Sequence, residues 1–341
     1  GGPAWSDAFI IVPWTIWQQY GDIRILEDHY ESMVKYMEYL VDNSPGKIRL
    51  LPNEKEIGPE NEERIGGYGD WLAMDGTKGR RGGTPRELIG TAFLAYDAFL
   101  MAQIAKALNK PDDADKHLMI YKETRTAFQE HFMGPAGLIN TGTQTAYVLA
   151  LHFNLIPEKY KPLNFGALVK AIEANEIHLT TGFVGTPYLC QVLSDGGRLD
   201  LAYSLLLQRT YPSWLYPVLH GATTIWERWD GWTEKAGFQD PSMNSFNHYA
   251  YGAIGAWLVE TVAGIHPDPA FPGFKHFHLQ PGFPVFPQQE GEEPITWADA
   301  EYQSPYGLIK SYWQMDDLLI TCDVFIPPHT SAILPVSIYV K

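Results

Sequence analysis

Helical periodicity is the sequence feature that most restricts the fold of this chain. From residue 6 to about residue 265, apolar residues recur every three or four positions, the spacing that places them on one face of an α-helix. In residues 24–42, for example, Leu26, Met33 and Met37 share such a face. Strand patterns are nearly absent over this span, so we predict a mainly α structure. The predicted helices cover residues 24–42, 84–109, 114–132, 143–155, 164–175, 183–195, 198–209 and 245–263.

The connections between these helices differ in length. Some are short polar turns such as Gly21-Asp22, whereas residues 44–83, 133–142 and 210–244 form long segments rich in glycine and aromatic residues. A ring of helical hairpins produces this asymmetry, with tight turns at one rim and long loops at the other. Sites are commonly built on such long loops. We therefore expect the functional residues on these long loops.

The sequence pattern changes near residue 268. Residues 272–281 (PGFKHFHLQP) and 295–336 alternate apolar and polar positions between Pro, Gly and Asp breaks, which is typical of antiparallel strands. We predict two domains from this change. Residues 1–268 form the helical domain, and residues 269–341 form a small antiparallel β-sandwich.

Charge and cysteine content disfavour two classes of ligand. The net charge of the 341-residue chain is −15 at pH 7, and such a field repels nucleic acid. The stretch GRRGGTP (79–85) lacks the Lys and Ser/Thr spacing of a phosphate-binding loop. Cys190 and Cys322 lie far apart, with no Cys or His nearby at metal-ligand spacing. We therefore expect no nucleic-acid partner and no metal site.

The N-terminal apolar run does not resemble a membrane segment. AFIIVPW (8–14) is too short to span a bilayer and lacks the basic leader of a signal peptide. We expect no membrane partner and a soluble protein, either cytoplasmic or periplasmic. Because the sequence begins at Gly1 and not at Met, we also expect that something upstream has been removed, which leaves the compartment open.

Tryptophan is concentrated around one glutamate. Residues 224–232 read TIWERWDGW, and Glu227 lies between Trp226 and Trp229. A partly buried carboxylate in an aromatic cleft is typical of glycoside hydrolysis, in which a ring stacks on the sugar and a carboxyl group moves a proton. Alternatively, Glu227 pairs with Arg228 or with a distant basic residue and supports the loop. The pattern alone leaves both interpretations open.

Longer motifs resemble one family. TTIWERWDGW (223–232) and FQDPSMNSFNHYAYGA (238–253) are similar to the catalytic domain of the bacterial α-L-rhamnosidases, glycoside hydrolase family 78. Residues 179–218, 4–22 and 68–73 (YGDWLA) fit the same family. The resemblance extends over essentially the whole chain. It implies an (α/α)6 barrel of the six-hairpin glycosidase type followed by a C-terminal β-sandwich. It also implies an inverting hydrolase that releases terminal α-L-rhamnose and needs no cofactor.

The resemblance also implies roles for individual residues. Glu227 matches the general base that activates the attacking water. Trp71 matches an aromatic residue that lines the rhamnose subsite, and Trp5 matches another. His248 matches a histidine that hydrogen-bonds the sugar. The expected partner of these residues is a rhamnose-containing glycoside or oligosaccharide.

Two further candidate substrate-binding residues also have structural alternatives. Trp229 follows Glu227 by two positions and forms either a wall of the pocket or the core of its own loop. Asp70 precedes Trp71, but a Gly-Asp pair also commonly caps or ends a helix. We include both residues among the predicted site residues.

One element of the family does not occur in this sequence. The family's general acid is a glutamate in a motif resembling DxPQRxER-x-GW-x-GD, which precedes the AWSDA segment (4–8), and the 341 residues contain no such motif. We expect the acid and the first barrel helix to belong to a missing N-terminal portion of the same enzyme. Since general acid catalysis contributes roughly 10²–10⁴-fold, we expect poor turnover from this chain alone.

Two other functions stay open at this point. A different (α/α)6 enzyme, such as a glucoamylase-like hydrolase or a sugar phosphorylase, would show the same helical pattern. A non-catalytic carbohydrate-binding or assembly subunit would account for the lack of the acid motif. Activity on an aryl α-L-rhamnoside distinguishes these possibilities.

Overall fold

The chain folds into two compact units. The computed structural model describes residues 2–49, 67–76, 80–284, 294–316 and 319–334. The first unit comprises Gly1–Trp14 and Leu26–Val192, and the second comprises Thr15–Ile25 and Leu193–Lys341. Helices α1 (Ala8–Tyr20) and α7 (Thr186–Asp195) contribute residues to both units, as does the first turn of the helix that begins at Arg24.

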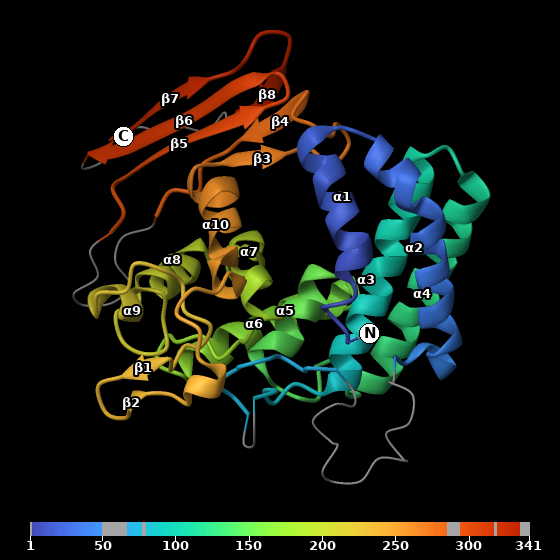
Figure 1. Ribbon diagram of the computed structural model, residues 1–341, viewed down its shortest axis with the longest axis horizontal. Helices are drawn as coiled ribbons and strands as arrows, with labels where there is room; N and C mark the ends of the chain where they lie inside the picture. The colour runs from blue at the N-terminus through green and yellow to red at the C-terminus, as the bar shows by residue number, and fades with distance from the viewer. Residues whose placement is uncertain (1, 50–66, 77–79, 285–293, 317–318, 335–341) are drawn as a thin grey trace. The chain divides into compact units, whose positions relative to one another are not determined.

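The first unit is built from helices that match the predicted segments closely. They are α2 (Arg24–Asp42), α3 (Arg86–Ala107), α4 (Pro111–Phe132), α5 (Gln144–His152) and α6 (Lys161–Glu173), with the short 3-10 helices η1 (Pro45–Lys47) and η3 (Glu158–Tyr160). Helices α3 and α4 pack side by side as an antiparallel hairpin (Figure 1). The predicted face of α2 is confirmed, since Leu26, Met33 and Met37 are all buried.

Helix α3 is the core helix of the first unit. It is the one helix of the described residues that is long and apolar enough to cross a membrane. However, 83% of its most apolar 18-residue window is buried inside the structure. A helix that is apolar on all sides is typical of the interior of a larger protein.

The helices of the second unit are shorter. They are α8 (Leu199–Leu207), α9 (Leu215–Leu219), η5 (Ala250–Ala253), α10 (Ile254–Trp257) and η6 (Leu258–Val262). The long predicted segment between α8 and η5 is mainly loop, but it contains the short helix α9. It also contains a two-stranded hairpin formed by β1 (Trp232–Thr233) and β2 (Gly237–Phe238), as well as η4 (Pro241–Met243).

The prediction of one continuous helix over residues 245–263 is wrong in two respects. The helical segment begins only at Ala250, and it changes from 3-10 to α to π geometry along its length. The residues before it are bonded elsewhere, because the carbonyl of Ser245 accepts the N–H of Glu227 and the N–H of His248 donates to Ile225. These backbone groups are therefore not available for a first helical turn.

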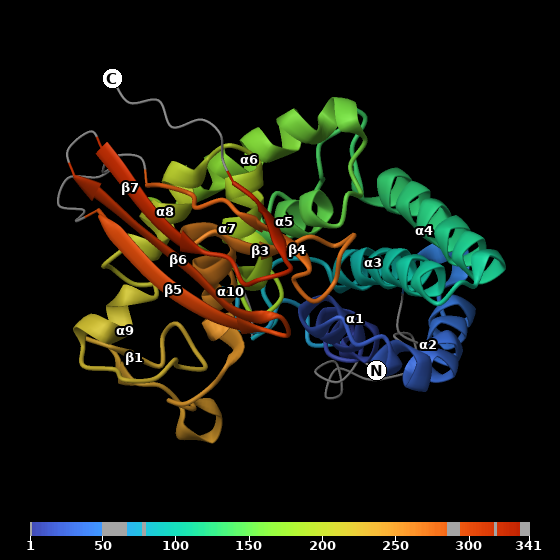
Figure 2. The ribbon, with the colours of Figure 1, turned by 90° about the horizontal axis from the view of Figure 1, so that it is seen from above.

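The C-terminal part forms two three-stranded sheets. One contains β3 (Ile265–Pro267), β4 (His276–Leu279) and β8 (Ser331–Ile333), and the other contains β5 (Trp297–Ser304), β6 (Gly307–Asp316) and β7 (Leu319–Phe325). The second sheet is an antiparallel meander, in which the three strands lie side by side (Figure 2).

The antiparallel prediction fails for one strand pair. Strand β3 pairs antiparallel with β4, but β8 pairs with β4 in parallel. Antiparallel neighbours can be joined by a tight hairpin, whereas parallel neighbours need a long connection. Here the whole β5–β6–β7 meander lies between β4 and β8 in sequence, so no hairpin fixes their direction.

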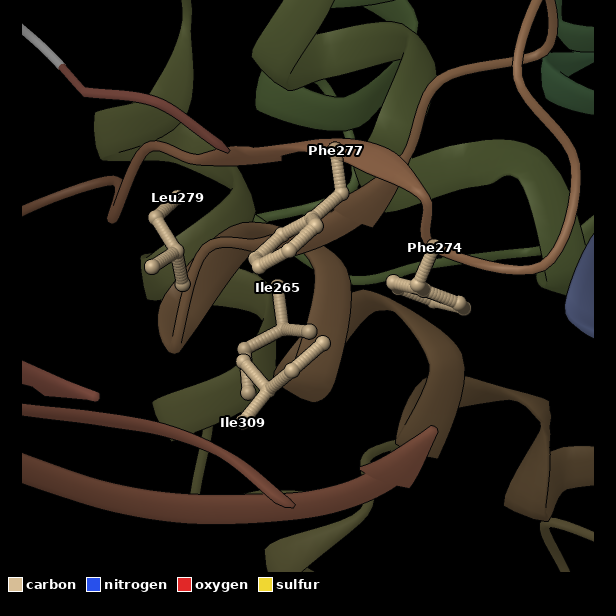
Figure 3. Packing of buried hydrophobic residues seen from close by; sticks show 5 residues of the cluster. All are labelled: Ile265, Phe274, Phe277, Leu279 and Ile309. Atoms are coloured by element: carbon tan, nitrogen blue, oxygen red, sulfur yellow. The ribbon is translucent and has the colours of Figure 1, made fainter. Parts of the chain in front are cut away.

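A compact apolar core lies between these two sheets (Figure 3). Its fully buried members are Ile265, Phe274, Phe277, Leu279 and Ile309. Side chains from β5 and β8 also pack against this core, so both sheets contribute to it, as in a sandwich. Strand β3 begins at Ile265, and the division of the chain into domains at residue 268 stays a prediction.

Candidate active site

Four aromatic side chains gather in the first unit, and two of them are predicted site residues. The rings of Trp5 and Tyr68 have centroids 4.7 Å apart, and those of Tyr68 and Trp71 have centroids 6.0 Å apart. Phe183 stacks on Trp5 at 6.5 Å. We call these four residues the tryptophan cluster. Trp5 and Trp71 are only partly buried, so their rings can offer apolar faces to a ligand.

Trp5 lies in a turn that a buried aspartate stabilises. Asp7 accepts a hydrogen bond of 2.6 Å from the N–H of Ala4. The guanidinium of Arg49 donates to both oxygens of Asp7, at 2.8 and 3.0 Å, and the hydroxyl of Tyr36 donates to one of them at 2.8 Å. Ala4 has a left-handed φ of 70°, which is unfavourable for a residue with a side chain. The bond to Asp7 therefore helps to hold the turn beside Trp5.

Trp5 also lines an open groove of about 630 Å³ in the first unit. Its other lining residues are Ser6, Ala8, Phe9, Lys35 and Tyr36. Ligand pockets commonly measure about 300–1,000 Å³. The groove is therefore large enough for a sugar residue beside Trp5.

Asp70, a predicted substrate-binding residue, is fully buried. One of its oxygens accepts hydrogen bonds from the Thr145 hydroxyl and from the N–H of Gly182, the latter at 2.8 Å. The other accepts from the N–H groups of Val184 at 2.8 Å and Gly185 at 3.3 Å. Burial raises the pKa of Asp70 to about 6, against the lowering effect of these donors. Both oxygens are occupied by the protein, so this placement argues against a contact with substrate.

Glu227 lies in the second unit, in the aromatic loop between α9 and η5, and is half-buried. Its carboxylate accepts a hydrogen bond of 2.9 Å from the N–H of Ser245, and its own N–H donates to the Ser245 carbonyl at 2.8 Å. The bonded oxygen is Oε2, so among the described residues Oε1 has no hydrogen-bond partner. A carboxylate held in this way has one oxygen fixed and the other open to water.

The structure does not support the alternative in which Glu227 forms an ion pair with Arg228 or with a distant basic residue. Arg228 donates two hydrogen bonds to Asp230, at 2.8 and 3.0 Å, and this pair is partly buried. The adjacent arginine is therefore committed to a different carboxylate. Within the described ranges, Glu227 forms no ion pair.

His248 lies close to Glu227, because backbone hydrogen bonds pair residues 225–227 with residues 245–248. Its N–H donates to the carbonyl of Ile225 at 2.9 Å, and its Nδ1 accepts a hydrogen bond of 3.3 Å from the N–H of Ala250. Its ring stacks on Tyr249 with centroids 5.2 Å apart. Because Nδ1 acts as an acceptor, the neutral ring carries its proton on Nε2, which makes Nε2 the donor.

The tryptophans around Glu227 form mainly the core of their loop. Trp229 is 4% exposed, and it stacks on Tyr251 at 3.8 Å and meets Trp214 edge-on at 5.4 Å. Trp226 is also buried, against the ring of Phe246. Trp232 is only partly buried. Of the two open interpretations of Trp229, the structure supports the loop core.

Trp226 and Trp229 also border a small cavity, which has a volume of about 30 Å³. This volume is far below the roughly 300 Å³ at which ligand pockets begin. The cavity is therefore too small for a sugar ring, and the tryptophans shape the loop without forming a sugar pocket of their own.

The predicted site residues thus form two local groups. Trp5 and Trp71 belong to the tryptophan cluster of the first unit, whereas Glu227 and His248 lie on the paired segments of the second. The meeting of the two groups at one cavity stays a prediction. No group of three His, Cys, Asp or Glu side chains among the described residues is arranged to hold a metal ion.

Several residues that support the site are not among the site residues predicted from the sequence. They are Asp7, Arg49, Thr145, Gly182, Gly185 and Ser245. Asp70 and Thr145 are separated by 75 positions, so no local pattern links them. The glycines of GFVGT (182–186) are the one sequence signal that marks a close approach of two backbone segments.

The helices, the C-terminal sandwich and the loop around Glu227 define a six-hairpin glycosidase fold. The bacterial alpha-L-rhamnosidase 6 hairpin glycosidase domain matches residues 1–262, and the bacterial alpha-L-rhamnosidase C-terminal domain matches residues 264–338. The chain therefore belongs to the bacterial alpha-L-rhamnosidase family. The resemblance found in the motifs is confirmed.

Two relatives cover nearly the whole chain. An alpha-L-rhamnosidase of Streptomyces avermitilis is 40% identical over 334 residues, which are 97% of this chain and 29% of the relative. An alpha-L-rhamnosidase of Formosa agariphila is 38% identical over 330 residues, which are 96% of this chain and 33% of the relative. The chain thus spans about a third of the length of these curated relatives.

Solved structures show the same fold. The crystal structure of Streptomyces avermitilis alpha-L-rhamnosidase complexed with L-rhamnose matches with a TM-score of 0.85 and 38% identity, over 98% of this chain and 29% of that one. The native enzyme from Aspergillus terreus matches with a TM-score of 0.82 and 29% identity, over 98% of this chain and 37% of that one.

Proposed function

We propose that this chain contributes the general base and part of the sugar-binding surface of an enzyme that hydrolyses terminal α-L-rhamnosides. The observation that carries the proposal is the hydrogen bonding of Glu227. The N–H of Ser245 fixes one oxygen of its carboxylate and leaves the other for water, and the neighbouring Arg228 pairs with Asp230 and not with Glu227. Membership of the alpha-L-rhamnosidase family supplies the substrate class.

The proposed reaction inverts the anomeric configuration. Glu227 deprotonates a water molecule on one face of the sugar, while a carboxylic acid on the opposite face protonates the leaving oxygen. In inverting enzymes the two carboxyl groups stand roughly 6.5–9.5 Å apart, which leaves room for the water. The hydrogen bond from the Ser245 N–H fixes the orientation of the base.

The sugar-contacting roles follow from exposure and hydrogen-bonding capacity. We assign the stacking faces to Trp5 and Trp71, which are partly exposed. We assign a sugar hydrogen bond to His248, whose Nδ1 already accepts a backbone N–H and whose Nε2 is therefore the donor. Trp229 and Asp70 are buried, so we assign them to the support of the loops that carry these groups.

The general acid is proposed to come from outside these 341 residues. The family motif for the acid does not occur in the sequence, and the chain spans about a third of its curated relatives. The proposed partner of this chain is therefore the remaining portion of the same enzyme.

Hydrolysis of an aryl α-L-rhamnoside tests the proposal. The 341-residue chain and a chain extended upstream are assayed in parallel, and proton NMR follows the anomeric form of the first product. We expect weak or no turnover by the short chain and hydrolysis with inversion by the extended one. Extended protein that binds rhamnose without hydrolysing the rhamnoside would identify a carbohydrate-binding subunit instead. First product with retained configuration would exclude the inverting role of Glu227.

A further inference from the structure

The buried carboxylate of Asp70 joins two loops that lie far apart in sequence. Its four hydrogen-bond donors are the Thr145 hydroxyl and the N–H groups of Gly182, Val184 and Gly185. Thr145 lies in the first turn of α5, and the three backbone donors precede α7. Asp70 is therefore the point at which the YGDWLA segment (68–73) is fixed to the rest of the first unit.

Backbone hydrogen bonds extend this connection on both sides of Asp70. The N–H of Phe183 donates to the carbonyl of Trp71 at 2.9 Å, and the N–H of Met74 donates to the carbonyl of Thr180 at 2.8 Å. The approach is so close that a Cβ on Gly182 would lie 2.2 Å from the Trp71 carbonyl oxygen. The two segments therefore behave as one rigid piece around the carboxylate.

Two members of the tryptophan cluster are attached directly to this piece. Trp71 is the residue after Asp70, and Phe183 lies between two of the backbone donors, Gly182 and Val184. Phe183 in turn stacks on Trp5. Displacement of the carboxylate would therefore move two rings of the cluster together.

We propose that Asp70 is a positioning residue for sugar binding, which sets the place of Trp71 and Phe183 without touching the sugar. This inference rests on the proposed function, because it needs Trp71 to contact the sugar. It differs from the sequence prediction, in which Asp70 itself binds substrate. A carboxylate suits the role because it offers acceptors to several donors at once and has no hydrogen to oppose them.

An asparagine cannot replace it, although its shape is the same. In Asp70→Asn, the amide nitrogen must face either the N–H groups of Val184 and Gly185, or the N–H of Gly182 and the Thr145 hydroxyl. The hydroxyl can rotate to accept, but each arrangement places N–H against N–H at least once. We therefore expect the two loops to separate locally in this variant.

The first measurement is hydrogen exchange in the extended protein. In Asp70→Asn, amides at residues 71–74 and 182–185 should exchange at least tenfold faster than in the wild type, while α3 (86–107) is unchanged. The matched control is Asp75→Asn, in the same segment. Asp75 accepts a hydrogen bond from Gly83, a near neighbour in sequence, so this variant should leave residues 182–185 unchanged. Unchanged exchange in Asp70→Asn would overturn the proposal.

The second measurement is the binding of L-rhamnose by calorimetry. We expect Asp70→Asn to raise Kd about tenfold, Asp75→Asn to change it less than twofold, and Trp71→Ala to raise it at least tenfold. In the Trp71→Ala background, Asp70→Asn should raise Kd by clearly less than tenfold, because part of its effect acts through the Trp71 ring. Multiplying effects in the double variant would contradict the positioning role.

Thr145→Val provides a milder test if Asp70→Asn does not fold. It removes one donor and keeps the carboxylate, and we expect a two- to threefold rise in Kd that is smaller in the Trp71→Ala background. Wild-type protein that fails to bind L-rhamnose would overturn the proposed function together with this inference. Normal binding by folded Asp70→Asn or Thr145→Val would overturn the inference alone.

Discussion

The guanidinium of Arg49 lies 2.8 Å from a carboxylate oxygen of Asp7, and both side chains are almost completely buried. A second buried carboxyl, that of Asp97, lies in the same region. Burial and the neighbouring Asp7 raise the pKa of Asp97 well above its usual range. Arg49 is the cation that directly contacts the Asp7 carboxylate in this buried region.

Replacement of Arg49 by methionine should destabilise the protein strongly. The change keeps much of the side-chain volume but leaves the Asp7 carboxylate buried without its cation, a loss that typically costs about 3–5 kcal/mol. Chemical denaturation measures the free energy of unfolding. The matched control is Arg24→Met, because the Arg24–Asp22 pair is exposed and such pairs contribute about 0–1 kcal/mol. Similar effects of the two changes would show that the buried pair is not a stabilising element.

The stability contributed by Asp70 should depend on pH. Its pKa is about 6 in the folded protein and 3.8 in an ordinary setting, with burial as the main cause. Between these values the folded state holds a proton that the unfolded state has released, so stability falls as the pH rises from 4 through 6. A difference of about two pKa units corresponds to at most about 3 kcal/mol.

Comparison with Asp70→Asn isolates this effect, because the amide does not titrate. The wild-type protein should lose stability relative to the variant as the pH rises from 4 to 7, as measured by denaturation at fixed temperature. The raised pKa of Asp70 would be contradicted if the free energy of unfolding of the wild type, relative to that of the variant, stayed constant or increased over this range.

Gly182→Ala should disrupt the contact between the two loops that Asp70 joins. The added Cβ would lie 2.2 Å from the carbonyl oxygen of Trp71, so backbone must shift, and overpacking of this kind typically costs about 1–3 kcal/mol. Gly166→Ala is the matched control. Nothing lies within 4 Å of a Cβ at Gly166 in α6, and alanine in a helix stabilises by about 0.5–1 kcal/mol. The midpoint temperature of thermal unfolding should therefore fall in Gly182→Ala and rise in Gly166→Ala.

Local patterns in the sequence were sufficient for the helices but not for the supports of the site. The face of α2 follows from the spacing of Leu26, Met33 and Met37 alone. Asp70, in contrast, is defined by donors 75 and 112 to 115 positions away. No periodicity encodes such a meeting, so the sequence offers Asp70 only as a candidate beside Trp71 and does not reveal its buried partners.

The tryptophans around Glu227 illustrate the same limit. Composition predicts aromatic packing near the carboxylate, but it does not tell which side of the loop each ring occupies. Trp229 packs between Trp214 and Tyr251, and Tyr251 is 22 positions further along the chain. The orientation of each ring depends on these tertiary partners, so only the structure separates loop core from pocket wall.

Glu227→Gln in the extended protein should retain the fold and sugar binding but lose most turnover. The amide oxygen can still accept the N–H of Ser245, which lies 2.9 Å from the carboxylate, whereas the amide cannot take a proton from water. Loss of a general base typically lowers turnover by about 10²–10⁴-fold. A small nucleophile such as azide should partly restore the reaction with an activated aryl rhamnoside, because it needs no deprotonation.

Asp230→Asn is the control for this prediction, since Asp230 is a neighbouring carboxylate of the aromatic loop. It forms a partly buried pair with Arg228, so its loss should lower stability while turnover stays within a few-fold of the wild type. Steady-state kinetics with both variants decide between the two carboxylates. Near-normal turnover by Glu227→Gln, with severe loss in Asp230→Asn, would transfer the role of base to Asp230 and leave Glu227 as a support for the loop through Ser245.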